Sequence, residues 1–300
     1  MRMLRIFKKT DNKAVGTLAV GCGGGGCNIA NRLGRISGVD ILTVNTDRKG
    51  LVRSRSNKRI LLGDGDAADG CGGDVELGMG LTAAASGMIE DHIKKYLNIV
   101  IMAGLGGGTG TGSAGIIAET AKRNGSRVIT MVTLPMSFEA GRRRTALGAL
   151  DGIKKNSDVL FVIDGDRLAE LDPALGAREA FSVLDQMMCE SFLTMTEMFD
   201  GSEGETVFRM MRNRTITVSF ADGMSIGKVA RALADGLMTG TAATSQPVIF
   251  IRGNIPQDGS EDIIRDTVSK VTGFEPVFVR GQPGHGMSLT MLTPVGDPVL

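Results

Sequence analysis

Short apolar runs recur along the first half of the chain, and most are followed by a stretch of helical spacing. We expect the runs to form strands at residues 17–21, 40–45, 59–62, 98–103, 127–134 and 158–163. Helices are expected at residues 28–33, 82–96, 113–123 and 142–155, and a Gly/Asp-rich loop at residues 63–80. Strands that alternate with helices are typical of βαβ units. The pattern therefore predicts an α/β fold with a parallel sheet covered by helices on both faces.

A long apolar segment at residues 179–199 separates this half from the rest of the chain. Apolar side chains occur all around the expected helix, which predicts that it is buried. Beyond it we expect strands at 215–220, 247–252, 276–280 and 286–292, helices at 225–238 and 261–271, and a loop at 221–223. The predicted organisation is a flexible N-terminal tail (1–14), a main α/β domain (15–178), a central helix (179–200) and a smaller α+β C-terminal domain (201–300).

The polar and Gly-rich segments of the first half follow the expected strands. They lie at residues 21–28, 45–47, 70–74, 104–112, 135–139 and 164–166. Open parallel sheets bind ligands beyond the carboxyl ends of their strands. The six segments should therefore meet at one edge of the sheet and form a single site.

The first Gly-rich segment contains G-x-G-x-x-G at Gly21, Gly23 and Gly26, between an expected strand and an expected helix. This spacing is the dinucleotide fingerprint, and Asp47 lies where an acidic residue would bind a ribose. By itself the motif suggests a NAD-dependent oxidoreductase. A lone G-x-G-x-x-G is a weak signal, and this reading stays open as one alternative.

The second Gly-rich segment, residues 104–112, has six glycines in nine residues and also includes Thr109 and Thr111. Backbone N–H groups before a helix form an anion site, and the threonines add hydroxyl donors. Two such loops at one edge suit a triphosphate better than a dinucleotide. The chain contains no G-x-x-x-x-G-K-[ST] motif, which excludes a P-loop NTPase.

Composition further limits the partners and binding sites that we expect for this protein. Of 300 residues 43 are glycine, the net charge is +1 and Trp is absent, so no nucleic-acid partner is expected. No apolar run approaches the roughly 18 residues that a membrane span needs, so no span is expected either. Six basic residues between Arg48 and Arg59, with no acid among them, form either a solvated face or a partner surface. The four cysteines and two histidines lack the spacing of a zinc site, so no metal site in the protein itself is expected. Free thiols favour a cytoplasmic protein.

The second segment, with Gly106-Gly-Gly-Thr-Gly-Thr-Gly112, resembles the signature of the tubulin/FtsZ superfamily. The resemblance is closer to FtsZ, because residues 21–28, 44–47, 135–139 with the following arginines, and 220–222 come in the same order. It covers about residues 15–245. It implies a Rossmann-like parallel-sheet GTPase domain at 15–178, followed by the central helix and the smaller domain.

The resemblance also implies a guanine nucleotide, GTP or GDP, with Mg²⁺ bridging its phosphates. Glu139 is expected to contact the ribose, Arg143 the γ-phosphate, and Phe181 and Asp185 the base. Arg142 and Arg144 are the neighbouring candidates for the γ-phosphate, and a core role for Phe181 stays open. The remaining expected nucleotide contacts are Gly23, Gly24, Gly25, Asn28, Asp47, Gly73, Gly106, Gly107, Gly108, Thr109 and Gly110. Glycine occupies position 165, where the family has a base-contacting asparagine.

Proteins of this family stack head to tail, and acidic residues of one subunit complete the nucleotide site of the next. The family pattern Asn-x-Asp-x-x-Asp corresponds here to Thr217, Ser219 and Asp222, so only Asp222 is expected to be catalytic. The resemblance thus predicts a filament-forming protein with slow GTP hydrolysis. A GTP-binding assembly factor or switch without hydrolysis is the second reading.

Overall fold

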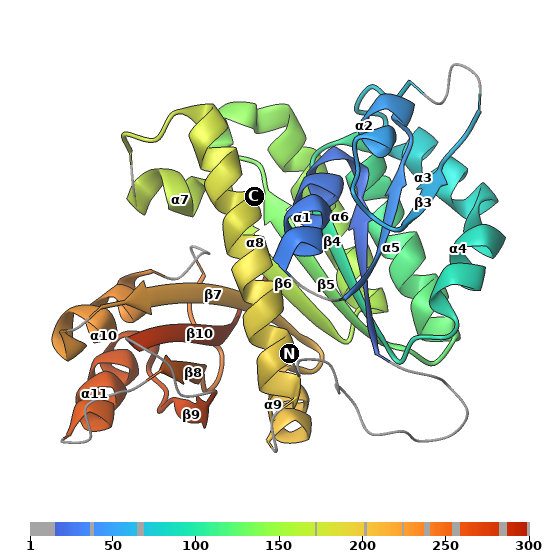
Figure 1. The fold of residues 1–300 in the computed structure, drawn as a ribbon. Coiled ribbons are helices and arrows are strands. Elements are labelled where there is room, and N and C mark those ends of the chain that lie inside the picture. The colour runs from blue at the N-terminus through green and yellow to red at the C-terminus, as the bar shows by residue number, and fades with distance from the viewer. Residues whose placement is uncertain are drawn as a thin grey trace.

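The computed structural model describes residues 16–36, 39–64, 69–171, 173–200, 203–223, 225–236, 241–253, 259–281 and 287–298. Its strands form one ten-stranded sheet (Figure 1). The predicted tail at 1–14 lies outside the described residues. In spatial order the strands are β3 (Lys58–Leu61), β2 (Asp40–Asn45), β1 (Thr17–Cys22), β4 (Asn98–Gly104), β5 (Arg127–Leu134), β6 (Val159–Asp164), β7 (Arg214–Asp222), β10 (Met287–Val295), β8 (Val248–Gly253) and β9 (Val277–Arg280).

The first seven strands of this order are parallel, which confirms the predicted α/β class. Side chains alternate between the two faces, so Leu18 and Val20 point to one apolar cluster and Ala19 to the other. One face is covered by α1 (Gly23–Ile36), α7 (Gly165–Leu171), α8 (Ala177–Asp200) and α9 (Gly204–Met211). The other is covered by α4 (Ser86–Ile93), α5 (Gly108–Arg123) and α6 (Ala140–Asn156).

The last strands of the sheet have their own apolar cluster, which they share with α10 (Ile226–Asp235) and α11 (Ser260–Thr272). The sheet nevertheless continues through β6 and β7, which pair in parallel at three positions, the first joining Val159 to Arg214. Helix α8 runs between the two parts, as Figure 1 shows. The boundaries proposed for the domains stay a prediction.

Several helices begin earlier than the sequence predicts. The later glycines of both loops are helical, because α1 begins at Gly23 and α5 at Gly108. Helix α3 (Val75–Ala84) occupies part of the segment predicted as a loop, and α7 and α9 are not predicted at all. Close packing explains the glycine-rich starts: a Cβ atom on Gly78 of α3 would lie 2.4 Å from the carbonyl oxygen of Gly108. Tertiary contact here overrides low helix propensity.

Helix α8 is buried along most of its length, but its first turns are not. Phe181 is 42% exposed, and Ser182 and Gln186 are exposed as well. The prediction that the helix is buried all around is therefore wrong at its N-terminal end. No helix in the described part of the chain is long and apolar enough to cross a membrane.

Candidate functional site

Two helix N-termini lie next to each other at the carboxyl edge of the sheet. Strand β1 leads directly into α1, and β4 leads through a short turn into α5. The two strands are paired in parallel, with Cys22 opposite Ala103. The first N–H groups of an α-helix have no partner within the helix and carry partial positive charge. Two such ends side by side are suited to an anion.

Most glycines of the two loops are required by close packing. A Cβ atom on Gly26 would lie 2.3 Å from the carbonyl oxygen of Met102, and one on Gly110 would lie 2.7 Å from that of Gly104. Gly106 and Gly23 also have positive φ, +91° and +66°, a region that favours glycine. These glycines shape the backbone whether or not a ligand binds.

Gly24 and Gly107 are different, because a Cβ atom on either would meet nothing within 4 Å. Both lie at or before the first turn of their helices, where the unpaired N–H groups are. Gly107 is the N-cap of α5, and as a glycine it has no side chain to cap the helix. The open space beside these two glycines therefore lies where an anion would bind.

Hydrogen bonds of Thr109 and Thr111 stabilise the second Gly-rich loop. The hydroxyls of Thr109 and Thr46 are hydrogen-bonded at 2.6 Å, and the Thr109 hydroxyl also lies 3.6 Å from the sulfur of Cys71. The Thr111 hydroxyl oxygen accepts from the backbone N–H of Gly106 at 2.8 Å. Gly73 lies in the next loop with φ +92° and open space around its Cα atom.

Asn28 and Asp47 lie at the same side of the sheet but in different settings. Asn28 is exposed on α1, one turn after the first glycines. Asp47 follows β2 and is the N-cap of α2 (Arg48–Val52), where its carboxylate accepts from the N–H of Lys49 at 2.9 Å. A ribose contact by Asp47 stays a prediction.

Glu139 closes the short helix η2 (Ser137–Glu139), between β5 and α6. One carboxylate oxygen, Oε2, accepts from the guanidinium of Arg142. The other, Oε1, is buried and has no hydrogen-bond partner among the described residues. An unsatisfied buried carboxylate oxygen is costly, so a donor supplied by a ligand would stabilise this arrangement.

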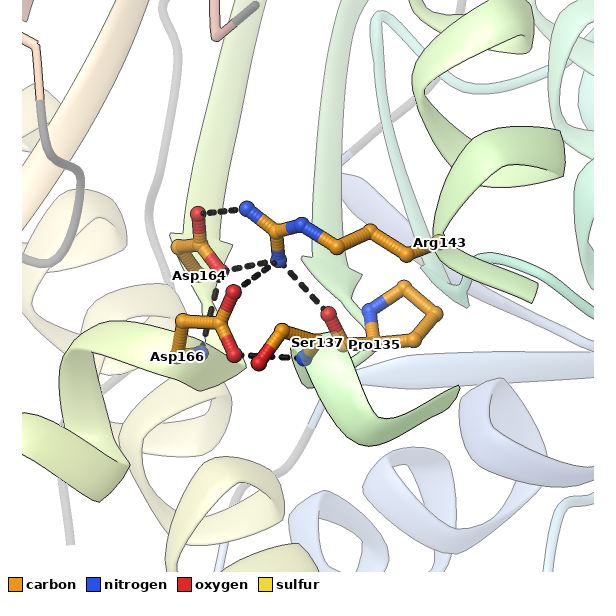
Figure 2. A network of polar contacts seen from close by, with 5 residues as sticks. All are labelled: Pro135, Ser137, Arg143, Asp164 and Asp166. Atoms are coloured by element: carbon orange, nitrogen blue, oxygen red, sulfur yellow. Dashed lines mark hydrogen bonds and ion pairs between the residues drawn. The ribbon is translucent and has the colours of Figure 1, made fainter. Parts of the chain in front are cut away.

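Arg143 is held by protein groups. Its guanidinium donates to both carboxylate oxygens of Asp164, at 2.7 and 2.8 Å, and to the carbonyl oxygen of Pro135 at 2.7 Å (Figure 2). Asp166 lies 3.0 Å from the same terminal nitrogen. The sequence places residues 164–166 among the segments of the site and Gly165 at a base-contact position, but it assigns no role to Asp164 or Asp166.

The start of α8 carries the two residues expected to meet a base. Phe181 and Asp185 are four residues apart and share one face of the helix. Burial raises the pKa of Asp185 to about 6, against a smaller lowering by Arg32. Arg32, on the neighbouring helix α1, donates to the Ser182 hydroxyl at 2.8 Å and was missed by the sequence analysis.

Gly165 occupies the expected position of a base-contacting asparagine, at the start of α7. A Cβ atom there would lie 2.8 Å from the carbonyl oxygen of Leu134 and 3.0 Å from the Met136 side chain. A side chain at this position would therefore require the backbone near Leu134 or Gly165 to shift.

Asp222 ends β7, and β5 and β6 lie between this strand and β4, which leads into the second Gly-rich loop. Asp222 is exposed at the end of β7, opposite Ser288 of β10, and it borders a cavity of about 330 Å³ between α8 and the sheet. Thr217 and Ser219 lie on the same strand but are fully buried. The Thr217 hydroxyl donates to the carbonyl oxygen of Val162, and the Ser219 hydroxyl has no partner among the described residues.

Comparison with known proteins agrees with this geometry. Residues 17–172 match the family described as "Tubulin/FtsZ family, GTPase domain". The chain is 37% identical over 183 residues to "Cell division protein FtsZ 1" of Thermococcus kodakarensis, which covers 60% of this chain and 49% of that protein. It is 36% identical over 183 residues to "Cell division protein FtsZ 2" of Methanocaldococcus jannaschii, covering 60% and 48%. The chain thus spans about half the length of these curated relatives.

Solved structures resemble a larger part of the chain. An FtsZ dimer of M. jannaschii superimposes with a TM-score of 0.78 and 26% identity, covering 93% of this chain and 88% of that one. A CetZ2 protofilament of Haloferax volcanii with bound GTPγS has a TM-score of 0.80 and 20% identity, covering 93% and 92%, and shows the common fold. The family match over residues 17–172, the two glycine loops and the shared architecture show that the chain belongs to the tubulin/FtsZ family.

Proposed function

We propose that this protein binds GTP and GDP at the carboxyl edge of the sheet. The observation that carries the proposal is the pair of adjacent helix N-termini with open space at Gly24 and Gly107. Their N–H groups would bind the phosphates. The phosphate-binding residues of the proposal are Gly23, Gly24, Gly25, Asn28, Gly73, Gly106, Gly107, Gly108, Thr109 and Gly110.

The other end of the nucleotide would lie against Glu139 and α8. The unpartnered oxygen of Glu139 suits a ribose hydroxyl, and Asp47 is the second candidate for the sugar. Phe181, partly exposed, would stack on the base. The Asp185 carboxylate can accept from both the N1–H and the 2-amino group of guanine, which adenine does not present. This pairing is the reason to propose a guanine nucleotide.

Mg²⁺ would arrive with the nucleotide. Among the described residues, no three His, Cys, Asp or Glu side chains form a cluster able to hold a metal ion. Mg²⁺ usually keeps several waters and binds substrate phosphates directly, so it requires no such cluster. The residues present therefore fit an ion held by phosphate oxygens and water. When bound, it would neutralise phosphate charge.

We also propose that copies of the chain assemble head to tail in the cytoplasm, and that a neighbour completes the site for hydrolysis. The M. jannaschii FtsZ structure is a dimer and the CetZ2 structure a protofilament. Asp222 is exposed, and two strands separate β7 from β4 and its glycine loop, as suits a residue that acts on a neighbour's nucleotide. It would position the attacking water. Without further acids we expect slow turnover, because one positioned acid or base contributes about 10²–10⁴-fold.

A nucleotide-controlled assembly factor without hydrolysis is the second candidate. Burial of Thr217 and Ser219 favours it, since neither hydroxyl can reach a neighbouring subunit from inside the sheet. Phosphate release measured against protein concentration, with GTP and Mg²⁺, distinguishes the two. A rate per subunit that rises above a threshold concentration supports completion of the site by a neighbour. No release at any concentration supports the switch.

Binding itself is tested with Gly107→Ala. The added methyl meets no protein atom within 4 Å, so the variant should fold normally. It would enter the proposed phosphate space, where overpacking costs about 1–3 kcal/mol and weakens GTP and GDP binding on the order of tenfold or more. Gly148→Ala, in open space on α6, is the matched control. Equal affinities in all three proteins contradict the proposed phosphate site, and bound NAD in the purified protein would favour the dinucleotide reading instead.

A further inference from the structure

Arg143 is enclosed by acceptors from two other elements. The carboxylate of Asp164, at the end of β6, binds both terminal nitrogens of the guanidinium, as Figure 2 shows. Asp166, in the first turn of α7, lies 3.0 Å from Nη1. The carbonyl oxygen of Pro135 accepts from the same Nη1 at 2.7 Å. Nη1 thus meets three acceptors with two hydrogens.

The local charge is unfavourable for a phosphate on this guanidinium. Two aspartates surround one arginine, and Asp164 is only 8% exposed, so its charge is poorly screened. Hydrogen bonds to Asp164 raise the pKa of Arg143 above its ordinary value, which keeps it cationic and committed to this partner. Bidentate arginine–carboxylate pairs of this kind are strong and specific in geometry. A phosphate would have to displace Asp164 or lie beside both carboxylates.

Arg143, Asp164 and Asp166, together called the arginine cluster, also hold the backbone segment that follows β5. Arg143 binds the carbonyl of Pro135, and Asp166 accepts from the backbone N–H of Ser137 at 2.5 Å. Asp166 is in turn tied to Asp164, because its own N–H donates to that carboxylate at 3.0 Å. Two residues beyond Ser137 the chain reaches Glu139, whose Oε1 is buried without a partner. The cluster therefore sets the position of the proposed ribose-binding carboxylate.

We infer that Arg143 is a positioning residue for Glu139 and not a ligand of the γ-phosphate. Its guanidinium, held by Asp164 and Asp166, fixes residues 135–139 so that the Glu139 carboxylate meets the ribose of the nucleotide. This inference rests on the proposed function, because it assigns a role within the same nucleotide site. It also distinguishes an arginine that binds the γ-phosphate directly from one that positions another residue of the site.

The test compares nucleotides that differ at one end only. Dissociation constants for GTP, GDP and 2′,3′-dideoxy-GTP are measured for the wild-type protein, Arg143→Lys, Arg143→Ala and Asp166→Asn. GTP and GDP differ at the γ-phosphate, and GTP and the dideoxy nucleotide differ at the ribose. Lys155→Ala, which removes an exposed cation in the last turn of the same helix, is the matched control and should leave every constant unchanged. Thermal unfolding of each variant shows that it is folded.

For a positioning residue, GTP and GDP affinities fall together by about tenfold, the effect of one lost charge-assisted hydrogen bond. The preference for GTP over the dideoxy nucleotide falls toward one, which general loosening of the fold would not cause. Asp166→Asn, which leaves the arginine in place, should show the same loss of ribose preference. If Arg143→Ala fails to fold, Asp166→Asn and Arg143→Lys carry the test.

Two results overturn the inference. One is a selective loss of GTP affinity in the Arg143 variants with GDP affinity retained, because this means a γ-phosphate contact. The other is a ribose preference that is missing in the wild-type protein or unchanged in the variants. If the wild-type protein binds no guanine nucleotide at all, the proposed function fails instead. The wild-type measurement therefore separates the two failures.

Discussion

Replacing Asp185 with asparagine should stabilise the nucleotide-free protein. Burial raises the pKa of this carboxyl from 3.8 to about 6, so the folded state disfavours its ionised form. At neutral pH the wild-type protein must nevertheless carry a charged, half-buried carboxylate on α8. An amide of the same shape carries no charge and avoids that cost.

The magnitude follows from the pKa shift. A rise from 3.8 to about 6 is about two pH units, and each unit corresponds to about 1.4 kcal/mol. The ionised carboxylate therefore costs the folded state at most about 3 kcal/mol. Desolvation of the asparagine amide offsets part of this gain. We expect Asp185→Asn to raise the free energy of unfolding by about 1–3 kcal/mol near neutral pH.

The direction of the pH dependence follows from the raised pKa of the Asp185 carboxyl. The folded state binds the proton more tightly, so the stability that Asp185 contributes is present at low pH and is lost as the pH rises from about 4 to about 6. The gain from the substitution should therefore be small below pH about 4, grow between pH about 4 and about 6, and stay nearly constant above that. Urea denaturation of nucleotide-free protein across this range measures the difference.

Glu179→Gln is the matched control, because this carboxylate is exposed in the first turn of the same helix. It should show no comparable gain. The reasoning is refuted if Asp185→Asn leaves the stability unchanged or lowers it near neutral pH. It is also refuted if the gain is independent of pH. Either result would mean that desolvation of Asp185 does not cost the folded state free energy.

Three further outcomes are expected. Asp185→Asn should also change the preferred base from guanine to xanthine, because the amide N–H donates to the xanthine 2-oxo group. Competition between GTP and XTP measures this preference. An unchanged preference for GTP would contradict a contact between Asp185 and the base. Ser219→Ala should raise the free energy of unfolding by about 1 kcal/mol, since it removes a buried hydroxyl without a partner, and a loss of stability in urea would contradict this. Cys22 and Cys27, whose thiol pKa values burial raises, should react with a disulfide reagent only after unfolding; rapid modification of the native protein would show that these sites open.

Apolar runs predict the strands of this protein well because burial on both faces leaves little choice of residue. The runs at 98–103 and 127–134 correspond to β4 and β5 within one residue. Helix starts are predicted less well. Gly108 and Gly23 have poor helix propensity, and only contacts between distant segments, such as Gly78 against Gly108, show why they are helical. Such contacts leave no periodic signal along the chain.

The site is predictable where topology alone brings residues together. Loops that follow parallel strands meet at one edge, so the convergence of residues 21–28 and 104–112 follows from the strand order. The surroundings of a single side chain cannot be predicted from the strand order. That Arg143 is enclosed by Asp164 and Asp166 depends on how β6 and α7 meet, and no spacing in the sequence encodes it.

Gly165 limits how this sequence can evolve. Asparagine at this position would place its Cβ atom 2.8 Å from the backbone oxygen of Leu134, and the segment that follows is tied down through Pro135 and Ser137. A single mutation to asparagine is therefore harmful, because a backbone segment has to shift to make room. A base-reading side chain at this position requires a wider separation between the end of β5 and the start of α7. It depends on the backbone of two elements and not on one residue.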